Sequence, residues 1–358
     1  MGLREITLSN FRCFDHTVLI PDPDAVTVLL SPNGSGKTSV LEAVHLLSTG
    51  QSFRTSSAGD IIRTGVDSGD AHAVVTHGTR RFQIDLVIRR GARSVTKHML
   101  VNGNRPASRA VLAESLPLTV FTPEGVDVIR HGPDQRRQLL DILATDSQPS
   151  DAPVFERFAR VVSQRNSLLR SFRGEAPSLV RRRELEVWDL EFVESSERVR
   201  EVRESLLTRL TPRLVEMYTR MAGVSTTISL EYLPSWETDL AATLREKLVE
   251  DVQRGYSTVG PHRDDFRALL DGRDARRQAS QGEQRSLALA LRLSAHHLVE
   301  ERGVHPLVLL DDVFSELDPE RATRLVGLLP PGQTLVTTAV PLPGAFSDAF
   351  VVDVRKAS

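Results

Sequence analysis

The sequence contains one cysteine, almost no net charge and no long apolar run. The single cysteine, Cys13, excludes an internal disulfide bond and any zinc site built from several cysteines, which is typical of a reducing compartment. We expect this thiol to be a small buried residue. A formal net charge of −2 removes any argument from bulk basicity, so binding to nucleic acid would have to rest on local clusters of arginine.

No segment of the sequence is apolar for long enough to cross a membrane. The opening segment MGLREITLSNFRCF carries charges and alternates in polarity, whereas a signal peptide would need an apolar run. We therefore expect a soluble protein of the cytoplasm. The 358 residues, of which 40% are hydrophobic and 26% are charged, are enough for one large split domain or for two domains.

The character of the sequence changes twice along the chain. Residues 1–122 combine strand-like runs with one helical pattern, and residues 246–358 return to this mixture with the strand-like runs HPLVLLDDVF and QTLVTTAV. Between them, residues 123–245 are dominated by long helical patterns, and we expect Pro212 to interrupt the longest of these. The helical segment reads as an arm, with GEAPS at residues 174–178 as a joint between two of its helices.

A phosphate-binding pattern lies between the apolar run AVTVLL and a helical pattern. The letters SPNGSGKT match G-x-x-x-x-G-K-[ST] except at the first position, which is Ser31. Serine is tolerable there at a cost of about 1 kcal/mol or less unless its φ is positive. In such a loop backbone N–H groups surround the phosphates, a lysine reaches the β- and γ-phosphates, and a hydroxyl binds Mg²⁺. The candidate ATP-binding residues are Asn33, Gly34, Ser35, Gly36, Lys37, Thr38 and Ser39, with Lys37 as the cation and Thr38 as the Mg²⁺ ligand.

An acidic pair follows a second buried strand. The run HPLVLLDDVF delivers Asp311 and Asp312 at the C-terminal end of this strand, where open α/β sheets place their chemistry. We expect Asp311 to hold Mg²⁺ together with Thr38, and Asp312 to be the base that orients the attacking water. Because Lys37 and the acidic pair are far apart in the sequence, the helical arm has to be an insertion within one split nucleotide-binding domain.

A third motif narrows the class of ATPase. The segment ASQGEQRSLALALRLSA places small and polar residues before an amphipathic helix, and it resembles the signature motif of ABC-type ATPases. In that superfamily the motif completes the site of the facing subunit, so that ATP lies between two chains. The resemblance implies that Ser280, Gly282 and Gln284 bind ATP in trans, and that SELD at residues 315–318 crosses the same interface.

Taken together, the motifs resemble the RecF family of bacterial recombination and repair proteins over nearly the whole chain. The matching segments are LSNFRCF, PNGSGKTSVLEAVHLLSTGQSFRT, FTPEGVDVIRHGPDQRRQLLD, VVSQRNSLLR, VGPHRDDF, ASQGEQRSLALAL and LLDDVFSELD. Ser31 and Pro32 stand where the family usually has glycine and then glutamate or proline, so the departures are Ser31 and also Glu283, which stands where a second glutamine is common.

The resemblance implies both a fold and a function. The fold is α/β, with an ABC-type P-loop ATPase lobe similar to the heads of SMC proteins and an inserted, mainly helical second lobe. The function is ATP-dependent dimerisation on gapped or junction DNA, with weak, DNA-stimulated ATP hydrolysis that releases the dimer. The resemblance also implies that the protein supports recombinase loading together with RecO and RecR in DNA replication, recombination and repair.

For several arginine residues the sequence allows two roles, either contact with a phosphate or a structural contact. Arg12 and Arg54 either approach a phosphate of the nucleotide or have an ordinary structural role. DNA-binding candidates, whose contacts would be to backbone phosphates, are Arg136, Arg137, Arg181, Arg182 and Arg183. The first two of these could instead pair with acidic neighbours. The motif VGPHRDDF contains His262, Asp264 and Asp265, but no further ligand at metal spacing, so we expect it to shape the ATPase lobe.

A second class of function stays open at this point, that of an ABC-type ATPase subunit of a transporter. The long separation between the signature and the P-loop argues against it. So does the segment TLVTTAVPL, which has no switch histidine after the acidic strand.

Overall fold

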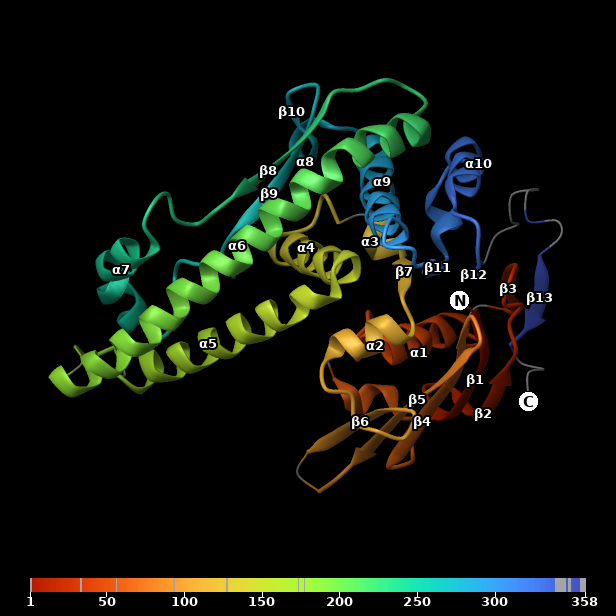
Figure 1. Cartoon of the computed structure of the whole chain (residues 1–358), viewed down its shortest axis with the longest axis horizontal. Coiled ribbons are helices and arrows are strands. Elements are labelled where there is room, and N and C mark those ends of the chain that lie inside the picture. The colour runs from red at the N-terminus through yellow and green to blue at the C-terminus, as the bar shows by residue number, and fades with distance from the viewer. Residues whose placement is uncertain are drawn as a thin grey trace. The chain divides into compact units, whose positions relative to one another are not determined.

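The computed structural model describes residues 2–32, 34–55, 57–92, 94–126, 128–172, 174–176, 178–338, 346 and 349–354. The chain divides into two compact units (Figure 1). Unit 1 combines Met1–Val126, Met217–Val224 and Ala288–Ser358, and unit 2 combines Asp127–Glu216 and Ser225–Leu287. The sequence placed an arm at residues 123–245. The structure begins the second unit close to that point but ends it at Leu287, so the signature residues Ser280, Gly282 and Gln284 lie in unit 2.

The first sheet of unit 1 is parallel throughout. Its strands, in order across the sheet, are β13 (Phe350–Asp353), β3 (Val26–Leu30), β12 (Thr334–Thr337), β11 (Leu307–Asp311) and β7 (Leu118–Phe121). The runs predicted as buried strands therefore form the middle of this sheet, as expected for parallel strands that are covered on both faces. The carboxyl ends of β3 and β11, which carry the P-loop and the acidic pair, flank β12.

The second sheet of unit 1 is antiparallel. Its strands, in order, are β2 (Phe14–Leu19), β1 (Gly2–Phe11), β4 (Ser68–His77), β5 (Arg80–Arg90) and β6 (Val95–Val101). Helix α1 (Lys37–Thr49) shares one apolar core with both sheets, and this core includes Leu41 of α1, Ile6 of β1 and Leu309 of β11. Because α1 is covered on nearly all sides, its N-terminus is held firmly at the end of β3.

Unit 2 is mainly helical. Its longer helices are α4 (Pro133–Ser147), α5 (Ala152–Ser171), α6 (Leu179–Ala222, which ends in unit 1) and α7 (Leu240–Arg254). A small antiparallel sheet of β8 (Ile228–Leu233), β9 (Asp265–Leu270) and β10 (Arg273–Asp274) completes it. The joint predicted at residues 174–178 is confirmed, since α5 ends at Ser171 and α6 begins at Leu179.

The predicted break at Pro212 is wrong, because α6 continues through it. A proline inside a helix costs about 3 kcal/mol, since it removes one backbone hydrogen bond and crowds the preceding turn. The apolar side chains on both sides of Pro212 are fully or almost fully buried; they are Leu206, Leu207, Leu210 and Leu214. Burying each such leucine stabilises the fold by about 1.5–3 kcal/mol, so packing outweighs the local penalty.

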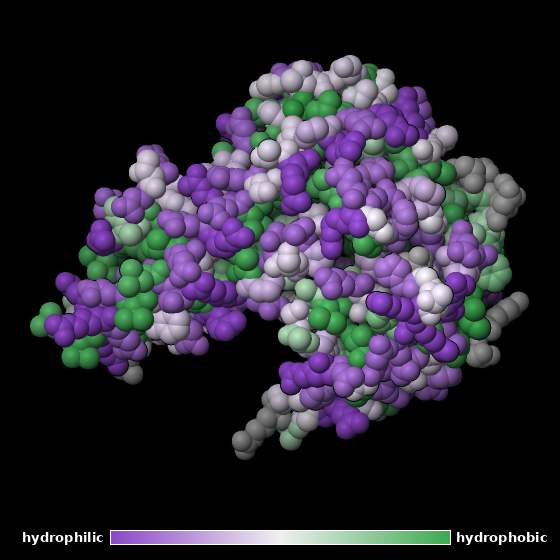
Figure 2. Space-filling view, in the orientation of Figure 1, coloured by the Kyte–Doolittle hydropathy of each residue, from purple (hydrophilic) through white to green (hydrophobic). Residues whose placement is uncertain are grey.

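The described part of the chain has no helix that is long and apolar enough to span a membrane. On the face drawn in Figure 2, hydrophobic residues form separate small patches and no continuous apolar band.

Candidate nucleotide-binding site

The P-loop connects β3 to α1 through two glycines in left-handed backbone conformations. Gly34 has a φ of 79° and Gly36 a φ of 98°. A Cβ atom at Gly36 would lie 2.5 Å from both the Cys13 sulfur and a ring carbon of Phe14, so this position accepts only glycine. Asn33, which the sequence assigned to ATP binding, lies outside the described residues.

The serine at the unusual first position makes a hydrogen bond of its own. Ser31 is not among the described residues with a positive φ, so it requires no glycine there. Its hydroxyl donates to a carboxylate oxygen of Asp353 on the neighbouring strand β13 at 2.7 Å. Lys37 directs its ammonium group back to the loop and donates to the carbonyl oxygens of Ser31 and Pro32. The first position of the P-loop is therefore fastened to the sheet.

The two motifs that carry the predicted Mg²⁺ ligands meet in the structure. The Thr38 hydroxyl donates to Oδ1 of Asp311 at 2.8 Å, across 273 positions of sequence. Thr337 of β12 donates to the same oxygen at 2.7 Å. A hydroxyl and a carboxylate side by side are hard oxygen donors of the kind that Mg²⁺ prefers, with phosphate oxygens and water completing its shell. These residues fit the predicted metal.

Asp312 occupies a strained turn immediately after β11. Its φ of 48° is uncommon for a residue with a side chain. Its N–H donates to the carbonyl oxygen of Thr337 at 3.1 Å and to the hydroxyl of the same residue at 3.0 Å. The turn places Asp312 on the wall of the pocket, next to Asp311, where the sequence predicted the base.

A pocket of about 610 Å³ opens above the P-loop within unit 1. Its lining consists of Arg12, Cys13, Gly34, Gly36, Lys37, Thr38, Ser39, Arg54, Asp60, Ile62, Thr64, Asp312 and Thr337. The volume suits a small-molecule ligand. Cys13 is exposed and forms part of this wall, so the prediction of a buried thiol is wrong. The reason is the tight β1–β2 turn, which brings Cys13 against Gly36.

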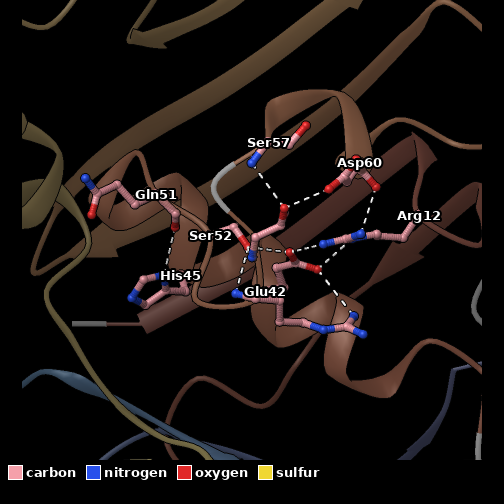
Figure 3. A network of polar contacts seen from close by, with 9 residues as sticks. Arg12, Glu42, His45, Gln51, Ser52, Ser57 and Asp60 are labelled. Atoms are coloured by element: carbon pink, nitrogen blue, oxygen red, sulfur yellow. Dashed lines mark hydrogen bonds and ion pairs between the residues drawn. The ribbon is translucent and has the colours of Figure 1, made fainter. Parts of the chain in front are cut away.

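The two arginines with open interpretations share one buried carboxylate, that of Glu42. Figure 3 shows Arg12 beside Glu42. Arg12 donates from Nε and Nη2 to the two carboxylate oxygens of Glu42, at 2.9 and 2.6 Å. Ser52 donates to the same carboxylate at 2.5 Å, and an Arg54 nitrogen lies 3.5 Å from it. Arg12 and Arg54 both reach the pocket wall. Sequence reasoning missed Glu42, although a carboxylate between buried Leu41 and Ala43 in the P-loop helix was a usable signal.

A buried histidine supports the loop that carries Arg54. His45 of α1 lies with Nδ1 2.9 Å from the carbonyl oxygen of Gln51, so the protonated Nδ1 donates to this loop. Its ring stands edge to face against Phe53 at 5.3 Å. Burial lowers the pKa of His45 to about 4, so the ring is neutral near pH 7.

The signature motif of unit 2 is organised by reciprocal capping of α9 (Gln281–Glu300). The Glu283 side chain accepts from the N–H of Ser280 at 2.7 Å, and the Ser280 hydroxyl accepts from the N–H of Glu283 at 3.2 Å. The unusual glutamate therefore has a structural function. Gln284 is buried and donates to the carbonyl oxygen of Ala275 at 2.8 Å, so its side chain acts within its own unit. Ser280 is exposed at the helix start, with Gly282 in the first turn.

Two of the DNA-binding candidates are buried in unit 2. Arg136 is 3% exposed and pairs with Asp265, while Arg137 is 9% exposed and donates to Asp134 and to the carbonyl oxygen of Asp264. Their burial contradicts the idea that they contact phosphates, because both guanidinium groups are enclosed and already bonded within unit 2. Arg181, Arg182 and Arg183 are exposed at the start of α6.

The VGPHRDDF motif has a structural role in the same unit. Asp264 accepts from the hydroxyl of Tyr232 and from the N–H of Ser235. Burial raises the pKa of Asp264 and lowers the pKa of His262 to about 4. No group of three or more metal-binding side chains of the His, Cys, Asp or Glu types occurs among the residues that the structure describes. The motif therefore fastens the loops of unit 2, whereas the sequence assigned it to the ATPase lobe.

Three features define an ABC-type ATPase. The first is a glycine-rich loop between a buried strand and a buried helix, and the second is an acidic strand end that contacts the threonine of this loop. The third is a signature helix with a capped N-terminus. The family model for the RecF/RecN/SMC N terminal domain matches residues 2–339. The chain is 34% identical to the DNA replication and repair protein RecF of Acidothermus cellulolyticus, over 96% of this chain and 95% of that protein. It is 35% identical to RecF of Geobacter sulfurreducens, over 92% of this chain and 90% of that protein. The chain belongs to the RecF family.

Solved structures agree with this assignment. The chain is similar to the recombination mediator protein RecF in complex with ATP, with a TM-score of 0.84 and 28% identity over 95% of this chain and 92% of that one. An Smc head bound to the C-winged helix domain of ScpA has a TM-score of 0.55 at 15% identity, over 97% of this chain and 91% of that one. The second likeness concerns the fold alone.

Proposed function

We propose that this protein is an ATP-dependent DNA-binding protein of recombinational repair. ATP brings two copies together on gapped or junction DNA, the complex supports recombinase loading with RecO- and RecR-type mediators in the cytoplasm, and slow, DNA-stimulated hydrolysis releases it. The observation that carries the proposal is the contact of Thr38 with Asp311 below a pocket that Lys37, Arg12 and Arg54 line. Relatives named DNA replication and repair protein RecF supply the biological setting.

The phosphates of ATP bind at the N-terminus of α1. Backbone N–H groups from Gly34 to Thr38 and the helix dipole attract them, and the Lys37 ammonium exchanges the loop carbonyls for β- and γ-phosphate oxygens. Thr38 and Asp311 would hold Mg²⁺, which neutralises charge on the phosphates. Asp312, which lines the same pocket, orients the water that attacks the γ-phosphate.

Dimerisation completes the site. Ser280 and the backbone of Gly282 present an exposed helix N-terminus, which favours an anion, to the nucleotide of a second copy. Gln284 positions this helix start through Ala275 and Arg276. The SELD segment begins with a Ser315 hydroxyl bonded to the carbonyl oxygen of Asp312, which connects the base to the proposed interface.

Sedimentation velocity of the Asp312→Asn variant with and without Mg-ATP tests the proposal. The variant slows hydrolysis, so a nucleotide-bound dimer accumulates and the sedimentation coefficient rises from that of the monomer. Lys37→Ala serves as the control and stays monomeric because it loses the phosphate cation. A chain that binds ATP yet stays monomeric at saturating nucleotide contradicts the sandwich between two copies.

A further inference from the structure

The pocket contains a carboxylate that ATP binding and hydrolysis, as described above, do not use. Glu42 lies in α1, one turn beyond Lys37 and Thr38, and its side chain is 0% exposed. Burial of a carboxylate is costly unless donors surround it. Glu42 receives three such bonds, two from the Arg12 guanidinium and one from the Ser52 hydroxyl.

The donors come from two segments that lie side by side, the β1–β2 turn and the loop after α1. Arg12 stands in the β1–β2 turn with a φ of 53°, and it also donates to the carbonyl oxygen of Asp60 at 2.7 Å. Arg54 lies beyond α1, where the Ser52 oxygen accepts the Arg54 N–H at 2.9 Å and the Thr55 N–H at 3.1 Å. Figure 3 shows the carboxylate of Glu42 between these segments. The loop that carries Arg54 is thus connected to Glu42 through Ser52.

The charges do not cancel. Glu42 supplies one negative charge to two guanidinium groups, whose side chains are 19% exposed for Arg12 and 44% for Arg54. Both line the same pocket as Lys37. Asp60 and Asp312 also line this pocket, so the positive charge is local to the two guanidinium groups and Lys37, where it suits a further phosphate group of a bound nucleotide.

We infer that Glu42 is a positioning residue that fixes Arg12 and Arg54 for the terminal phosphate of ATP, and so sets the preference for ATP over ADP. This inference rests on the proposed ATP-binding function. The carboxylate is fully buried, and it acts by holding the two guanidinium groups at a fixed place on the pocket wall.

Glu42→Gln tests the inference, because glutamine keeps the shape and removes the charge. Titration with ADP and with a slowly hydrolysed ATP analogue should show about a 10- to 100-fold loss of affinity for the analogue, the range of a charge-assisted hydrogen bond. The affinity for ADP should change less than about threefold, because Lys37 and the loop amides stay in place. A purely structural role would weaken both nucleotides alike, and that result overturns the inference.

Three further variants test whether Glu42 acts through the arginines. In a double-mutant cycle with Arg12→Ala, the double variant should lose little more than Glu42→Gln alone, whereas additive losses contradict action through Arg12. Asp15→Asn removes a neighbouring surface pair with Arg63 and should leave the ratio of the two affinities unchanged. If Glu42→Gln fails to fold, Ser52→Ala should lower the same ratio severalfold, and an unchanged ratio refutes the inference. A wild-type chain that binds no ATP refutes the proposed function itself.

Discussion

At the scale of single residues, the hydroxyl of Ser31 reaches Asp353 ahead of the phosphate cradle. We predict that Ser31→Ala lowers the free energy of unfolding by about 1 kcal/mol, the net value of one hydrogen bond, and changes the Kd for ATP less than about threefold. Ser31→Gly, which restores the usual residue, should be less stable again by about 0.5–1 kcal/mol, because glycine is freer in the unfolded chain. Urea unfolding and nucleotide titration measure the two quantities.

Asp353→Asn provides the matched control for Ser31, since it changes the acceptor of the same bond. The loss of stability in the double variant should fall short of the sum of the two single losses. A loss of ATP affinity above about tenfold for Ser31→Ala, with stability unchanged, would show that Ser31 contributes to binding and not to the loop's attachment.

Local sequence was sufficient for the core of the candidate site. The strand–loop–helix pattern predicted Lys37 and Thr38 at a helix start, and the acidic strand end predicted Asp311 beside them. Burial depends on chain segments distant in sequence, so no spacing rule indicated that Arg136 is enclosed by Asp265, or that Glu42 holds Arg12. In an arginine-rich motif, the sequence alone does not distinguish a buried, paired arginine from an exposed one.

At the scale of elements, a buried arginine joins three segments of unit 2. Arg165 of α5 is 0% exposed; it donates to Asp189 of α6 at 2.7 Å and to Asp251 of α7 at 2.8 Å. Ser257 accepts a further bond from the same guanidinium. We predict that Arg165→Met lowers the free energy of unfolding by about 3–5 kcal/mol, because two carboxylates would be left without their cation. Thermal and urea unfolding of the variant measure this.

Arg157→Met is a matched control on the same helix. Arg157 also bridges α5 to α6, through Glu191 and Glu194, but all three side chains are largely exposed. Water and salt screen such a pair, so the loss should stay below about 1 kcal/mol. Equal losses in the two variants would contradict the claim that burial decides the contribution of these ion pairs.

Helix existence was predictable in unit 2, but one helix limit was not. Apolar spacing indicated the long helix, but the proline rule ended it at Pro212, where packing in fact carries α6 onward to Ala222. The signature segment shows the converse case: Ser280 and Glu283 stand at capping-box spacing, so this helix start was readable from the sequence alone.

At the scale of the whole molecule, DNA affinity tests which arginines serve the proposed function. We predict that Arg182→Glu with Arg183→Glu weakens DNA binding at least about tenfold and flattens its dependence on salt, because exposed arginines release counterions when they meet phosphates. ATP affinity should not change. Fluorescence anisotropy with gapped DNA at several salt concentrations measures this. Arg198→Glu, on the same helix and paired with Glu201, is the control and should bind DNA nearly as the wild type does.

Buried histidines should make the fold sensitive to acid. Burial lowers the pKa of His45, His262 and His296 from 6.5 to about 4, so that both units contain such a residue. Between these values the unfolded chain binds a proton that the folded chain excludes. The free energy of unfolding should therefore fall as the pH drops from 6.5 to 4, by at most about 1.4 kcal/mol per pH unit for each histidine.

Aspartates act in the opposite sense, since burial raises the pKa of Asp141, Asp189 and Asp264, and the folded state therefore binds their protons first. The contribution of His45 to the pH dependence of the free energy of unfolding is measured by comparing a variant with the wild type. His45→Asn keeps an N–H near the carbonyl oxygen of Gln51 but cannot titrate, so its unfolding free energy should change less between pH 7 and 5 than that of the wild type. If His45→Asn keeps the full slope in urea titrations at the two pH values, His45 is protonated in the folded chain, and its neutral contact with the loop before Arg54 is refuted.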